Sequence, residues 1–252
     1  MTHSDKIELL EQYYHKYNQV GFIKDDPISI PHRFSKLQDI EISGFFAAMF
    51  SWGQRITIIN KCNALLAMMD DAPYQFISQH QPTDLKPFES FKHRTFNGTD
   101  ALYFMAFLQD FYQSHHSLEE AFVGTKMKEI LTHFHQQFFA LEFAPKRTQK
   151  HIATPARNST CKRLNMFLRW MVRKDNQGVD LGVWKNISTQ QLMMPLDVHV
   201  ERSARKLGLI KRKQRDWKTV EELTKNLKRF DPNDPVRFDY ALFGMGLENA
   251  DI

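Results

Sequence analysis

Apolar residues recur at intervals of three and four along most of the chain, which is the spacing of one face of an α-helix. The segments with this pattern are one that begins near Ser4 and those at 39–50, 56–69, 100–113, 117–122, 126–139, 162–173, 198–207, 217–230 and 235–245. No β-hairpin, internal repeat or low-complexity run is evident. The pattern therefore predicts an all-α fold.

Capping residues and prolines mark where these helices begin and end. Ser4, Asp216 and either Asn233 or Asp234 precede apolar periodic segments, so we expect them to act as N-caps. Two prolines within 22–34 predict a loop there.

One long stretch has no helical periodicity and is basic and polar. It covers 144–155, and we expect it to connect two sub-lobes of about 40–143 and 150–252. Together with the N-terminal helix, these sub-lobes would form a single helical unit over 1–252.

Composition excludes several classes of protein. Only 10 glycines are present, and neither a GxxxxGK[ST] nor a GxGxxG phosphate-binding motif occurs. Two cysteines cannot build a disulfide framework. Neither a signal peptide nor an apolar run of membrane-spanning length is visible, so we expect a cytoplasmic protein with no membrane partner. The net charge of +5 is compatible with an anionic partner.

The histidines do not have the spacing of a metal site. His115 and His116 are adjacent, and His133 and His135 are two positions apart. Neither spacing places two imidazoles on one helical face, and no HExxH or CxxC motif occurs. We therefore expect no metal and no other cofactor.

Two segments carry residues with catalytic potential. Lys162 begins an amphipathic helix, where the helix dipole disfavours a cation and so favours the neutral, nucleophilic amine. Asp197 follows Pro195 and Leu196 and precedes another helix, as an N-cap does. Taken separately, a solvated lysine and a capping aspartate explain these two residues equally well.

The combination of the two segments resembles the helix-hairpin-helix DNA glycosylase superfamily. Members show a lysine helix followed by V-D-x-H-V-x-R and R-L-G-L, and this chain has LDVHVER at 196–202 and RKLGL at 205–209. The likeness spans roughly 40–252 and is closest to a bacterial family of similar length. The nearest analogue of known activity is the archaeal-type 8-oxoguanine glycosylase.

The resemblance implies a two-lobed helical architecture and assigns roles to residues of this chain. Lys162 would be the nucleophile that attacks the sugar C1′, and Asp197 the catalytic carboxylate. Base-pocket or strand-plug residues would be Trp52, Gln54 and Phe243. Contacts to DNA phosphate would come from Arg157, Ser159, Thr160, Lys211, Arg212 and Lys213.

Two features depart from the superfamily pattern. The glycine-rich hairpin before the lysine is replaced by a glycine-free segment at 153–160, so the hairpin would be a variant. The four-cysteine iron–sulfur motif of some members is absent.

The sequence thus predicts a DNA N-glycosylase with abasic-site lyase activity. It would act in base-excision repair on double-stranded DNA with a flipped damaged base, 8-oxoguanine being the lesion of the nearest analogue. The alternative is a non-catalytic helical module that binds damaged or distorted nucleic acid.

Overall fold

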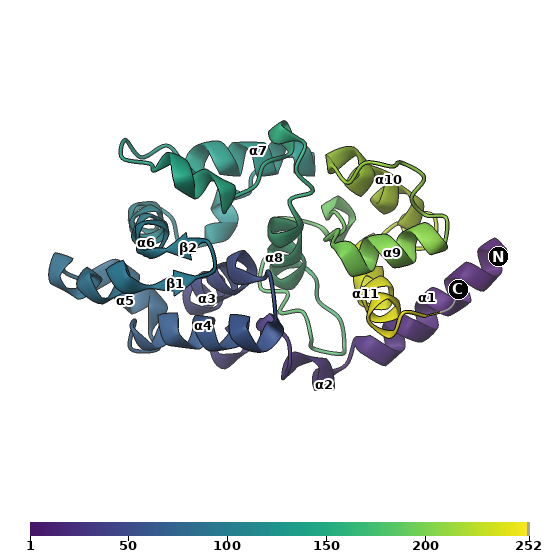
Figure 1. The fold of residues 1–252 in the computed structure, drawn as a ribbon, viewed down its shortest axis with the longest axis horizontal. Helices are drawn as coiled ribbons and strands as arrows, with labels where there is room; N and C mark the ends of the chain where they lie inside the picture. Colours follow the sequence, from purple (N-terminus) through teal and green to yellow (C-terminus); the bar gives the residue numbers. More distant parts are fainter. Residues whose placement is uncertain (251–252) are drawn as a thin grey trace. The chain divides into compact units, whose positions relative to one another are not determined.

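The protein is mostly helical, which confirms the predicted all-α class (Figure 1). The computed structural model describes residues 1–250. The α-helices are α1 (His3–Tyr17), α2 (Val20–Ile23), α3 (Leu37–Phe50), α4 (Arg55–Ala67), α5 (Pro73–Gln79), α6 (Gly98–Tyr112), α7 (Met127–Phe138), α8 (Lys162–Val172), α9 (Val198–Lys206), α10 (Trp217–Leu227) and α11 (Asp239–Glu248). Short 3-10 helices are η1 (Pro27–Ser29), η2 (Pro31–Arg33), η3 (Pro82–Ser90), η4 (Leu118–Ala121), η5 (Lys146–Lys150), η6 (Pro155–Arg157), η7 (Thr189–Gln191) and η8 (Pro235–Phe238).

The chain forms two compact units, each built from separate stretches of sequence. The first unit comprises 1–24, 125–128 and the chain from 154 onward, and the second comprises 25–124 and 129–153. Among the described residues, no helix combines the length and apolar character needed to cross a membrane.

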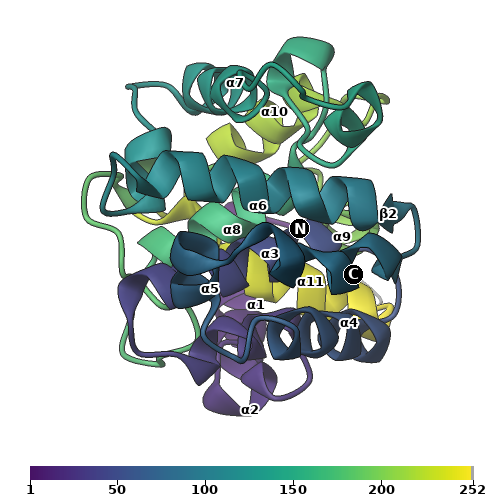
Figure 2. The ribbon, with the colours of Figure 1, turned by 90° about the vertical axis from the view of Figure 1, so that its left-hand side faces the viewer.

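The second unit is organised around α3, which is buried on every face from Ile40 to Phe50. Phe45 of α3 stacks on Phe104 of α6, with 5.5 Å between ring centroids. Figure 2 shows α6 running across the unit above α3 and α5. The one buried acid of α3, Glu41, accepts hydrogen bonds from the Tyr112 hydroxyl and other donors. A mainly apolar helix is therefore surrounded by neighbours on all sides, as expected for a core helix.

In the first unit, α11 packs against both α1 and α9 (Figure 1). Two glycines of α11 permit this close approach. A Cβ on Gly244 would lie 2.2 Å from the ring of Tyr17, and one on Gly246 would lie 2.7 Å from His199 Cβ. The glycines are needed because any larger residue would push the helices apart.

Several predicted details were wrong. A two-stranded hairpin exists, with β1 (Lys92–His93) paired antiparallel to β2 (Phe96–Asn97). Strands of two residues are too short to show an alternating pattern, so no pattern in the sequence indicates them. Thr2, not Ser4, caps α1, since its side chain accepts from Asp5 N.

Other boundaries also differ from expectation. The stretch predicted as a helix at 117–122 forms only a 3-10 turn, and the predicted loop at 22–34 contains two such turns. Helix α5 was not predicted. Asp216 was predicted correctly, because its side chain caps α10 by accepting from Thr219 N.

Candidate active site

Lys162 is the first residue of α8, and its position is fixed by the turn before it. Cys161 precedes it in a left-handed conformation with φ of 50°. The side chain of Ser159 accepts from Cys161 N at 3.2 Å, and Asn165 Nδ2 donates to Thr160 O at 3.1 Å. These hydrogen bonds fix the start of α8, and the Lys162 side chain remains 26% exposed.

Asp197 is the N-cap of α9, as predicted. Its Oδ1 accepts from the backbone N–H groups of His199 and Val200, both at 2.9 Å. The other oxygen, Oδ2, lies 4.0 Å from Lys162 Nζ. Two helix N-termini therefore bring an amine and a carboxylate together, across 35 positions of sequence.

The chain between these residues folds back along α8. The N–H groups of Leu181 and Gly182 donate to Trp170 O, and Trp184 N donates to Met171 O. These bonds satisfy carbonyls at the end of the helix. Further on, Met194 N donates to the Thr224 hydroxyl of α10. The return path is thus fixed along its length, which delivers Asp197 to Lys162.

A buried ionic network lies along α8 beyond Lys162. Arg169, two turns after the lysine, forms ion pairs with Asp180 and with Asp239 at the start of α11. One turn later, Arg173 pairs with Asp180 and Asp234. All but Asp234 are nearly inaccessible to solvent. Sequence reasoning missed this network, although Arg169 and Arg173 flank the apolar run 170–172 at the end of α8, and arginines among apolar residues are a signal of buried ion pairs.

The network contains one carboxyl group with a strongly perturbed acidity. Burial raises the pKa of Asp239 to about 7, against the attraction of Arg169. That value already includes two opposing effects: the negative charge of Asp197 raises the pKa of Asp239, and the positive charge of Lys162 lowers it. Asp239 therefore responds electrostatically to both residues of the candidate site.

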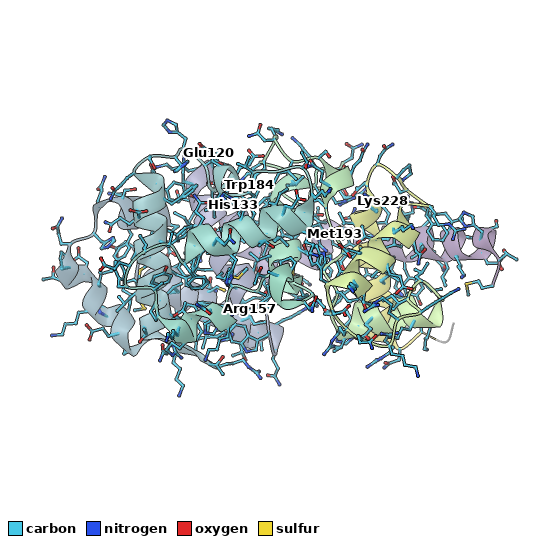
Figure 3. The ribbon with its side chains drawn as sticks, turned by 90° about the horizontal axis from the view of Figure 1, so that it is seen from above. Glu120, His133, Arg157, Trp184, Met193 and Lys228 are labelled. Carbon is cyan, nitrogen blue, oxygen red and sulfur yellow. The ribbon has the colours of Figure 1, made fainter. Side chains whose placement is uncertain are left out.

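The three residues predicted to bind phosphate before α8 form one short turn. Arg157 ends η6 and is exposed (Figure 3). Asn158 follows with φ of 56°, and its carbonyl accepts from Trp217 N. Residues in left-handed conformations, which usually favour glycine, thus shape this glycine-free segment.

The second predicted phosphate-binding group lies between α9 and α10. Lys211 and Lys213 are exposed. Arg212 is half-buried, and its guanidinium donates to Asp216 at 2.8 Å and to the Thr219 hydroxyl at 3.3 Å. Arg212 thereby supports the N-terminus of α10, and the two lysines project to solvent.

The predicted base-contacting residues belong to different units. Trp52 and Gln54 lie in the turn between α3 and α4 of the second unit, where Gln54 is exposed. Phe243 lies on α11 of the first unit, half-buried, with its ring centroid 5.6 Å from that of His199. The convergence seen for Lys162 and Asp197 lies wholly within the first unit.

Within residues 1–250, no three His, Cys, Asp or Glu side chains are grouped so as to hold a metal ion. No curated protein and no solved structure matches the chain. A family described as "Protein of unknown function (DUF2400)" matches residues 26–248, which span nearly the whole sequence. The chain therefore belongs to the DUF2400 family.

Proposed function

We propose that the protein is a DNA glycosylase with abasic-site lyase activity, in which Lys162 is the nucleophile and Asp197 the catalytic carboxylate. The observation that carries the proposal is the 4.0 Å separation of Lys162 Nζ and Asp197 Oδ2. Both side chains are partly exposed, at 26% and 22%, so a substrate can reach them. The sequence resemblance supplies the substrate class, a damaged base in double-stranded DNA.

The chemistry requires a neutral amine beside a base. Asp197 Oδ2 is close enough to take a proton from Lys162 through one water molecule. The amine lone pair then forms a bond to the sugar C1′ while the glycosidic bond breaks, and its electron pair leaves with the base, which takes up a proton. Loss of a proton from nitrogen and opening of the sugar ring give a Schiff base. β-Elimination releases the 3′ phosphate, and water hydrolyses the Schiff base to restore the amine.

The two oxygens of Asp197 would have separate roles. Oδ1 is held by two backbone N–H groups of α9, so the carboxylate cannot rotate freely. Oδ2 remains directed toward Lys162, where it can also stabilise positive charge that develops on the sugar. A fixed carboxylate needs no reorganisation during the reaction, which is the condition under which electrostatic stabilisation is most effective.

Borohydride trapping tests the proposal. The purified protein is mixed with duplexes that contain 8-oxoguanine or an abasic site, and the covalent adduct is measured for wild type, Lys162→Gln and Lys228→Gln. Lys228 lies just after α10, is exposed and provides a matched loss of charge (Figure 3). We expect an adduct with wild type and Lys228→Gln, and at least about a hundredfold less with Lys162→Gln.

Other outcomes would point elsewhere. An adduct that persists in Lys162→Gln would move the chemistry to another amine and refute the role of Lys162. Salt-sensitive DNA binding that yields no adduct with any lesion, and that survives in Lys162→Gln, would instead indicate the non-catalytic binding module.

A further inference from the structure

The β1–β2 hairpin of the second unit has an unusual residue at its turn. Lys92 pairs with Asn97 and His93 with Phe96, so Arg94 and Thr95 alone form the loop. Arg94 has φ of 53°. Two-residue hairpin loops favour glycine, asparagine or aspartate at positions with positive φ, because a longer side chain strains the backbone there. An arginine at such a strained position indicates that its guanidinium has a functional role.

The same arginine lies against a glycine of the α3–α4 turn. Gly53 has φ of 110°, and a Cβ at that position would stand 2.5 Å from Arg94 Nη1. Only glycine accommodates both the conformation and the approach of the guanidinium. The hairpin turn and the α3–α4 turn, each with a left-handed residue, therefore meet at Arg94 and Gly53.

The hairpin carries two exposed cations whose side chains have no ion-pair or hydrogen-bond partner in the part of the chain that the structure describes. Arg94 and Lys92 are exposed, and within residues 1–250 neither side chain forms an ion pair or hydrogen bond. Arg147 of η5 donates to Thr95 O at 3.1 Å, which joins a further basic segment to the hairpin. Neither 92–95 nor 145–151 contains an acid. The carboxylate that Arg147 contacts, that of Asp100, is buried and paired with Arg147.

An aromatic residue completes the surface. Trp52 precedes Gly53 and rests on two buried histidines, with ring centroids 4.9 Å from His93 and 5.8 Å from His151. The indole is thus held in place beside the exposed Arg94. An immobilised aromatic ring next to an unpaired guanidinium fits a nucleic acid, which offers a base face and a phosphate at close spacing.

We propose that Arg94, on the hairpin tip formed by Lys92–Thr95, binds a backbone phosphate of the DNA next to the turn that carries Trp52 and Gln54. This inference rests on the proposed function, because it assumes a DNA partner. It adds to that function a phosphate contact in the second unit, on an element that the sequence did not reveal.

Replacement of Arg94 by glycine provides the test. Arg94→Gly removes the guanidinium and also relieves the backbone strain, so a loss of binding cannot be attributed to unfolding. Lys86→Ala is the control, because Lys86 is an exposed cation of the same unit, on η3. Affinity for a duplex with a tetrahydrofuran abasic-site analogue is measured at several salt concentrations, and melting temperatures are recorded.

We expect Arg94→Gly to weaken binding about tenfold and to lower the slope of log Kd against log salt by about one phosphate contact. Its melting temperature should be equal to that of wild type or higher, and Lys86→Ala should bind nearly as wild type does. Equal affinities for Arg94→Gly and Lys86→Ala would overturn the inference alone. Failure of the wild type to bind the duplex would overturn both this inference and the proposed function.

Discussion

Each unit contains a buried aspartate paired with an arginine, yet the two carboxyl groups differ in acidity. In the second unit, burial alone would raise the pKa of Asp100, but hydrogen bonds from His151, Asn97 N and Thr148 lower it to about 2. In the first unit, burial raises the pKa of Asp239 to about 7 even though Arg169 is its ion-pair partner.

The difference lies in the number of donors and in the surrounding charge. Asp100 accepts from the backbone of Asn97, from Thr148 and from Arg147, so its negative charge is satisfied at both oxygens. Asp239 shares its partner Arg169 with Asp180, and the negative charge of Asp197 also raises the pKa of Asp239. One arginine therefore fixes a charged carboxylate only where other donors assist it. Asp100 holds structure together, whereas Asp239 can change its protonation near neutral pH.

The largest effect should come from Asp100→Asn. Asparagine keeps an acceptor for Asn97 N but removes the charge that Arg147 and His151 face, so we expect the free energy of unfolding to fall by about 3 kcal/mol. Asp239→Asn should cost only about 1 kcal/mol at pH 7, because that carboxyl is already half protonated there and Arg169 keeps Asp180.

Urea unfolding of both variants beside wild type measures these losses. Equal losses would show that Asp239 is as strongly ionised as Asp100, and the contrast between the two carboxyls would be wrong.

The pH dependence should have opposite sign for the two groups. The pKa of an unfolded aspartate is about 3.9. Because the folded pKa of Asp239 is raised to about 7, its contribution to stability is full below pH 4 and is lost as pH rises to about 7, by no more than about 1.4 kcal/mol per pH unit. The contribution of Asp100, whose pKa is lowered to about 2, is full above pH 4 and is lost as pH falls through 2.

Differences between wild type and each variant isolate these contributions from other titrating groups. Melting temperatures recorded from pH 3 to pH 8 should show the advantage of wild type over Asp239→Asn shrinking as pH rises. A wild-type advantage that stays constant from pH 4 to pH 7 would mean that Asp239 does not titrate in that range.

The helical framework was predictable because it depends on local periodicity. The start of α8 at Lys162 and the caps Asp197 and Asp216 follow from residues next to one another in sequence. The β1–β2 hairpin was not predictable, since two-residue strands carry no pattern and Arg94 occupies a position where glycine is expected.

The candidate site was predictable only in part, for a related reason. The sequence named Lys162 and Asp197 through a motif, whereas their 4.0 Å approach depends on how the intervening chain returns along α8. One of the two partners of Arg169, Asp239, lies 70 positions away in the sequence. No local pattern specifies which acid pairs with an arginine over such a distance. The ionic network along α8 could therefore be identified only from the structure.

The smallest expected effects on stability come from the capping aspartates, and they distinguish helix capping from a catalytic role of Asp197. Asp197 and Asp216 each cap a helix of the first unit. Replacement of either by alanine should lower the free energy of unfolding by about 1 kcal/mol, and Asp197→Asn by only a few tenths, since asparagine caps nearly as well. Under the proposed function, both Asp197 variants should lose borohydride-trapped adduct, whereas Asp216→Ala should keep it.

This set of variants distinguishes chemistry from helix stability. Asp197→Asn retains the cap but cannot accept a proton from Lys162 or carry a negative charge beside the sugar. A stable Asp197→Asn protein that forms adduct at the wild-type rate would leave Asp197 as a cap and no more, like Asp216. If Asp216→Ala reduced trapping as much as Asp197→Ala does, the loss would reflect weakened helices, and the carboxylate near Lys162 would have no special part in the reaction.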